Sequence, residues 1–164
     1  MKNADSLRTL KAELKYDIEQ MSALLEKYER VKQKLAGIEP DEFDYIALAY
    51  MITNLYDHLE NYFLRISKAF ENQLDPPQWH KQLLLRMPLE IEGLRPAFMS
   101  TSDLGPFDEL RAFRHVFRHG YQHDLDLERL LTLDQSVPAV VSRFRELHAE
   151  FLKKLDGIIE RLEP

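Results

Sequence analysis

The sequence lacks cysteine, has only five glycines and contains no long apolar run. Without cysteine, a disulfide framework and a thiolate metal site are both excluded. We expect no membrane-spanning helix, because no stretch approaches the roughly 18 apolar residues that such a helix needs. Charged side chains recur through residues 1–17, which is not the pattern of a secretory signal. We therefore expect a soluble, cytoplasmic protein that makes no contact with a membrane.

The chain is also poor in positive charge, with a net charge of −6 at pH 7. This balance argues against a protein that coats nucleic acid with its whole surface. One short stretch departs from it, because residues 111–123 contain three arginines, three histidines and no acid. The sequence therefore predicts a local basic site on an acidic protein.

Apolar residues recur at helical spacing in two long segments, 6–35 and 41–72. Asp5 and Ser6 are candidate N-caps for the first segment, and Gly37 with Pro40 separates it from the second. Two helices of about 30 residues joined by a short turn form an antiparallel hairpin. The sequence therefore predicts two long antiparallel helices at the N-terminus.

Shorter helical segments follow this hairpin. We expect a helix over 78–85, a loop over 90–106 with Asp103 near a helix cap, and a helix over 106–120. A brief helical turn is expected over 127–133, and a last helix from Pro138, a good first-turn residue, to 162. No internal repeat or strand alternation is present. The prediction is an all-α bundle of four to five helices that forms a single domain over residues 1–164.

A helical wheel at about 100° per residue divides residues 110–121 into two faces. The face expected to meet the core carries Leu110, Phe113, Val116 and Phe117. The opposite face, called here the polar arc, carries Arg111, Arg114, His115, Arg118, His119 and Tyr121. With no acid expected on the same turns, its arginines repel one another. Either acids such as Asp57 and Glu60 neutralise them in a structural network, or an anion binds them. The polar arc is expected to add little to the core.

The order of residues within the polar arc is more specific than its charge. Residues 114–121 read Arg-His-Val-Phe-Arg-His-Gly-Tyr, which has the form Arg-x4-His-x-Tyr. This resembles the defining motif of the HEPN superfamily, specifically of HepT-like toxins, in which the residue after the arginine is usually polar, as His115 is. Residues 54–63, 79–84 and 95–97 are also similar to a HepT-like subfamily, so the resemblance covers most of the chain. It departs from the simplest members because 43 residues follow Tyr121.

The resemblance implies a HEPN-type bundle and metal-independent cleavage of an RNA substrate, without a cofactor, by a homodimer in which two motifs meet. Arg114 and His119 would be catalytic, and Arg111, His115 and Arg118 would bind the substrate. An imidazole can exchange protons at neutral pH, and an arginine can hold a phosphate. Arg114 and His119 are about 140° apart on a regular helix, so they converge poorly within one protomer. A dimer, or a helix break at Gly120, is therefore required.

Tyr121 has two interpretations. One is an ordinary interfacial aromatic residue. The resemblance implies another, in which a MntA-like nucleotidyltransferase antitoxin adds AMP to Tyr121 and silences the toxin. Tyr121 lies only about 20° from Arg114 on the wheel, so a modified phenol would lie beside a phosphate-binding arginine.

Three other functions remain open. His115, His119 and His123 are spaced so that they could present imidazoles to zinc, although the neighbouring arginines would repel a divalent cation, and we expect no metal. The chain could instead be a non-catalytic HEPN-fold module that binds RNA or a protein. It could also be a helical interaction module with a structural Arg/His cluster. The intact Arg114, His119 and Tyr121 favour a ribonuclease toxin of a HepT/MntA-like toxin–antitoxin pair.

Overall fold

A computed structural model describes residues 3–37, 39–71, 79–120 and 124–163. Within these ranges the chain forms five α-helices and one short 3-10 helix, with no strand. The helices are α1 (Ala4–Ala36), α2 (Glu42–Phe70), α3 (Trp79–Arg86), η1 (Thr101–Asp103), α4 (Leu104–His119) and α5 (Leu127–Leu162). The predicted all-α bundle with two long N-terminal helices is confirmed. No helix in the described ranges combines the length and apolarity needed to span a membrane.

The two long N-terminal helices begin at side-chain caps. Asn3 caps α1 by accepting a hydrogen bond from the Ser6 N–H at 2.8 Å, so the cap lies before the predicted Asp5 and Ser6. Asp41 caps α2 by accepting from the Phe43 and Asp44 N–H groups at 2.9 and 3.0 Å. Each cap satisfies N–H groups that have no partner inside the helix.

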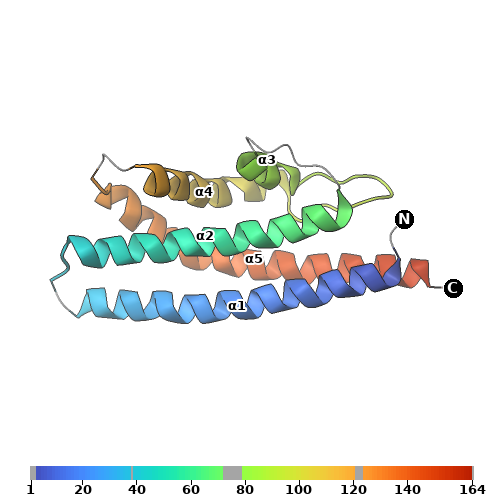
Figure 1. The fold of residues 1–164 in the computed structure, drawn as a ribbon, viewed down its shortest axis with the longest axis horizontal. Helices are drawn as coiled ribbons and strands as arrows, with labels where there is room; N and C mark the ends of the chain where they lie inside the picture. Colours follow the sequence, from blue (N-terminus) through green and yellow to red (C-terminus); the bar gives the residue numbers. More distant parts are fainter. Residues whose placement is uncertain (1–2, 38, 72–78, 121–123, 164) are drawn as a thin grey trace.

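The four longest helices, α1, α2, α4 and α5, pack around a common core (Figure 1). Helix α1 packs against α2 and α5 and is antiparallel to both. Helix α4 runs antiparallel to α2 and packs against α2 and α5, and α3 lies against α2 and α4. The two ends of the chain lie at one end of the bundle, and α4 ends at the opposite one.

An aromatic cluster between α2, α4 and α5 holds α4 in place. Tyr62 and Phe63 of α2 meet Phe144 of α5 with ring centroids 4.9 and 6.1 Å away, and Phe107 of α4 lies 6.1 Å from Phe63. Full burial of each such side chain stabilises the fold by about 1.5–3 kcal/mol. The Tyr62 hydroxyl also forms a 2.8 Å hydrogen bond with Nδ1 of His148, whose pKa is lowered by burial.

The start of α4 is tied to α5 by Asp103. Its carboxylate accepts hydrogen bonds from Nε of Arg143 at 2.8 Å and from the Ser100 N–H at 2.9 Å, and the second bond is part of the capping box of η1, so Asp103 lies near a helix cap as predicted. The bond from Arg143 holds the pKa of Asp103 at about 2. Together with the aromatic cluster, this pair fixes the direction in which α4 leaves the core.

The two helical segments predicted over 127–133 and 138–162 are a single helix, α5, with Pro138 inside it. Proline has no N–H, so the carbonyl of Asp134 loses its helical donor. The Tyr28 hydroxyl of α1 lies 3.4 Å from that carbonyl and also donates to the Asp134 carboxylate. Figure 1 shows the first turns of α5 set at an angle to the rest, as a proline inside a helix produces.

Candidate functional site

Helix α4 carries the Arg-x4-His part of the motif to the end of the bundle away from the termini (Figure 1). Leu110 and Phe113 face the core as predicted, but two assignments from the wheel are wrong. Val116 is 50% exposed, whereas Arg114 is only 6% exposed. The buried face of α4 is rotated toward Arg114 because the helix packs on polar groups of α2 as well as on the aromatic cluster.

Arg114 is buried in a charged network with α2. Its Nη1 donates to Oδ1 of Asp57 at 3.0 Å and to Oε1 of Glu60 at 2.6 Å. Its guanidinium also lies over the ring of Tyr56, 5.3 Å from the ring centroid. Burial raises the pKa of Asp57 against the opposing effect of the nearby arginines. Arg114 therefore locks α4 onto α2.

The other two arginines of the polar arc also have acidic partners. Nη2 of Arg118 lies 2.5 Å from Oδ2 of Asp57, and Nε of Arg111 lies 2.6 Å from Oδ1 of Asp108. The expectation of no acid on the same turns is wrong, because Asp108 precedes Arg111 by one turn of α4. The structural network with Asp57 and Glu60, given above as an alternative, is present. Arg118 nevertheless stays 49% exposed at its side chain.

The two histidines of α4 are exposed beside these arginines. Nδ1 of His119 lies 2.9 Å from the backbone carbonyl of His115, and the two rings are 4.6 Å apart. A carbonyl only accepts, so in the neutral ring the proton sits on Nδ1 and Nε2 keeps its lone pair. His119 thus offers a proton acceptor to solvent. It lies on the exposed side of α4 while Arg114 lies on the buried side, so the two side chains diverge within one protomer, as their separation of about 140° on the wheel predicts.

Gly120 ends α4, as the sequence predicts. Its N–H donates to the Val116 carbonyl at 2.8 Å, and a Cβ at this position would lie 2.6 Å from the same oxygen. Glycine is therefore required for the helix to end in this conformation. Residues 121–123 follow, so Tyr121 and His123 lie outside the described residues.

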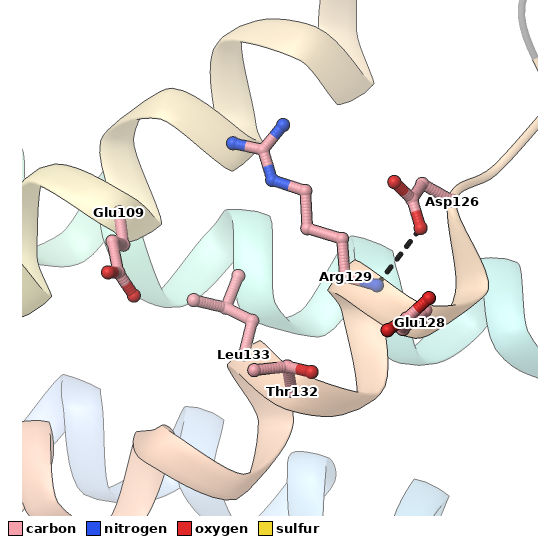
Figure 2. A pocket seen from close by; sticks show the side chains of 6 residues that line it. All are labelled: Glu109, Asp126, Glu128, Arg129, Thr132 and Leu133. Atoms are coloured by element: carbon pink, nitrogen blue, oxygen red, sulfur yellow. Dashed lines mark hydrogen bonds between the residues drawn. The ribbon is translucent and has the colours of Figure 1, made fainter.

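A cavity of about 480 Å³ lies between α4 and the first turns of α5 (Figure 2). It is lined by Glu109, Asp126, Glu128, Arg129, Thr132 and Leu133. Figure 2 shows the Arg129 side chain reaching across it toward α4. Its three carboxylates would repel an anion such as a phosphate.

Part of this site could be found from the sequence and part could not. The sequence named Asp57 and Glu60 as acids that could neutralise the arginines, and both contact Arg114. Tyr56 was missed, because nothing in its spacing indicates that an arginine lies over its ring. In the described ranges no group of three potential ligand side chains could hold a metal ion. The three-histidine alternative includes His123 and is not tested.

A sequence model of the HepT-like protein family matches residues 47–155. The match covers more than half of the chain, including most of α2, all of α4 and most of α5. Neither a curated protein nor a solved structure matches the sequence. The motif, the helical bundle and this match agree, and the chain belongs to the HepT-like family.

Proposed function

We propose that this protein is a metal-independent ribonuclease toxin that cleaves RNA with His119 and the arginines of α4. The observation that carries the proposal is the state of His119, whose side chain is exposed, is bonded through Nδ1 to the His115 carbonyl and has no hydrogen-bond partner at Nε2 among the described residues. Membership of the HepT-like family supports it. The fixed tautomer suits a general base, which needs a free nitrogen lone pair near neutral pH.

The reaction assigns a role to each exposed group. Nε2 of His119 takes the proton of a ribose 2′-hydroxyl, the 2′-oxygen attacks phosphorus, and the bond to the 5′-oxygen breaks. The leaving 5′-oxygen takes up a proton from water, the other product is a 2′,3′-cyclic phosphate, and the protonated His119 returns its proton to solvent. Arg118 and His115 lie beside His119 and would hold the phosphate, as a guanidinium does through paired N–H groups. Arg114, predicted as catalytic, is buried, so we propose that it positions α4 in the first place.

We propose that a second copy of the chain completes the site. Tyr50 and Asp57 are seven residues apart and so share one face of α2, the face that α4 covers at Asp57. Toward the start of α2 this face continues beyond the end of α4 (Figure 1), and Phe43 and Tyr50 are 74% and 57% exposed. Exposed aromatic side chains in a contiguous stripe are typical of an interface. A homodimer would cover them next to the motif.

A second function is favoured by the ion pairs themselves. Arg114 and Arg118 already have acidic partners, so the cluster could be structural in a member that binds RNA or a protein without cleaving it. The two functions differ in the consequence of removing His119. In the described part of the chain its ring contacts only its neighbour His115, one turn earlier in the same helix, so we expect its loss to affect chemistry or binding more than the fold.

The decisive experiment is incubation of purified protein with mixed RNA, with and without EDTA. We expect cleavage to survive EDTA, and His119→Ala to lower its rate by about two orders of magnitude or more, as loss of a general base does. Arg30→Ala removes an exposed cation from α1 and is the matched control, expected to leave the rate unchanged. Cleavage by His119→Ala at the rate of the unmodified protein would eliminate this mechanism.

We further propose that a MntA-like nucleotidyltransferase silences the protein by adding AMP to Tyr121. An added phosphate next to Gly120 would compete with RNA for the arginines of α4. Co-expression with the cognate enzyme is expected to raise the intact mass by one or more AMP units. Tyr121→Phe should abolish the increase, whereas Tyr16→Phe, at an exposed tyrosine of α1, should not. A mass increase that persists in Tyr121→Phe would place the modification elsewhere.

A further inference from the structure

At the end of the bundle that holds both termini, far from the motif, residues 90–97 lie near the last turns of α5 (Figure 1), and a groove is formed there. It runs between residues 90–97 and the last turns of α5 and consists of two hollows of about 340 and 580 Å³. Both hollows are lined by Glu90, Pro96, Ile158 and Arg161, so they are continuous. None of its lining residues belongs to the site proposed above.

Residues 90–97 form one wall of this groove and are held in place by the buried side chain of Arg95. Arg95 is 1% exposed, and its Nη2 donates to the carbonyls of Arg86 at 2.5 Å and Leu89 at 3.0 Å. Its Nε lies 3.1 Å from Oε1 of Glu71, and Ile91 pairs with Arg95 as a β-bridge. A buried guanidinium is costly unless it has such partners. The groove is therefore preformed, and a ligand would not have to order it.

The helical wall of the groove is cationic. Lys153, Lys154 and Arg161 line it, and in the described part of the chain none of the three forms an ion pair with a carboxylate. Nζ of Lys154 donates to the Ala97 carbonyl at 2.7 Å, and Nε of Arg161 to the Gly157 carbonyl at 2.9 Å. Main-chain carbonyls fix these side chains without neutralising them.

Two acids near this end of the chain are directed to α1, away from the groove. Asp156 pairs with Lys11 and Glu163 pairs with Arg8, both on α1. These two carboxylates are thus separated from the cations of the groove, while Glu160 is exposed on α5 next to Arg161. In a protein of net charge −6, this separation leaves a local surface that attracts acids.

Apolar side chains accompany the cations. Leu94 and Leu162 are about half exposed and line one hollow together with Ile91 and Ile158, and Leu89 is exposed beside them. We propose that the groove is a docking site for a segment of a partner protein that carries leucine-like side chains beside acidic ones. The apolar side chains would fill the hollows, and the acids would pair with Lys153, Lys154 and Arg161.

The lining favours a protein segment over RNA. Single-stranded nucleic acid is held by aromatic side chains that stack on its bases, and none of the described residues that line the two hollows is aromatic. Partly exposed leucines instead favour an apolar side chain, because contact between the two removes apolar surface from water.

A direct test measures the fluorescence anisotropy of a short labelled peptide built from Leu-Leu-Glu-Glu repeats. We expect saturable binding that weakens as salt is added. Lys154→Glu combined with Arg161→Glu should lower the affinity at least about tenfold. Leu94→Ser should lower the affinity and leave its salt dependence intact. Lys27→Glu with Arg30→Glu, two exposed positions on α1, is the matched control and should bind like the unmodified protein.

Two results would overturn the proposal. One is a peptide that does not bind saturably, or that binds equally to the charge-reversed variant. The other is a single-stranded RNA oligonucleotide that binds instead and loses affinity in that variant. The variant should cleave RNA at the rate of the unmodified protein, because its changes lie at the other end of the bundle. Docking and nuclease activity can therefore fail independently.

Discussion

Arg114 joins the motif to the core, since its guanidinium is buried between α4 and two acids of α2. We expect Arg114→Ala to lower the free energy of unfolding by about 3–5 kcal/mol, because it removes the cation from a buried ion pair. Urea denaturation followed by circular dichroism measures this loss. The expectation that the polar arc adds little to the core is therefore wrong for Arg114. A lower cleavage rate in Arg114→Ala would reflect loss of folding as well as any loss of catalysis.

Arg118→Ala is the matched control for this prediction. Arg118 shares Asp57 with Arg114, but its side chain is half exposed. Its removal should cost about 1 kcal/mol or less, as exposed ion pairs do. If Arg114→Ala and Arg118→Ala lost the same small amount, the buried network would not be what holds α4 on α2.

Two glycines of α4 should respond to alanine in opposite directions. At Gly120 the added Cβ would lie 2.6 Å from the Val116 carbonyl oxygen, so the helix end must shift, and we expect a loss of about 1 kcal/mol or more. At Gly105, in the first turn, the Cβ would meet nothing within 4 Å. Gly105→Ala should stabilise the helix by up to about 1 kcal/mol. Thermal unfolding of both variants measures the contrast, and a stabilising Gly120→Ala would refute this account of the helix end.

The repeat of apolar residues predicted the positions of the helices better than it predicted their ends or which of their faces is buried. The long stripes of α1 and α2 fixed those helices, because a buried apolar face leaves a clear repeat. Pro138 indicated a new helix, since sequence alone does not reveal that Tyr28, more than 100 positions earlier, supports the carbonyl that proline leaves without a donor. Likewise the helical wheel could not predict that the Arg114 side chain is buried, because its burial depends on two acids of α2.

At the scale of the whole molecule, the sequence identified the candidate site by residue order and the structure sorted its members. Arg114, His115, Arg118 and His119 all lie on one helix, as predicted. Residue spacing did not predict the different roles of these side chains, in which a buried arginine holds the helix and exposed histidines face solvent. That division depends on how α4 packs against α2, which is a property of the tertiary structure.

The last prediction concerns assembly. The uncovered face of α2 should pair two copies of the chain, so the purified protein should have the mass of a dimer by light scattering at micromolar concentrations. Phe43→Ser with Tyr50→Ser should yield a monomer, because burial of these two side chains supplies much of the apolar contact. The monomer should stay folded, since both side chains are already exposed in one copy. Tyr16→Ser, at an exposed tyrosine of α1, is the control and should remain dimeric.

If two motifs must meet, the monomer should also lose RNA cleavage. An unmodified protein that is monomeric at these concentrations would contradict the assembly, and a monomeric variant with full activity would show that one motif suffices.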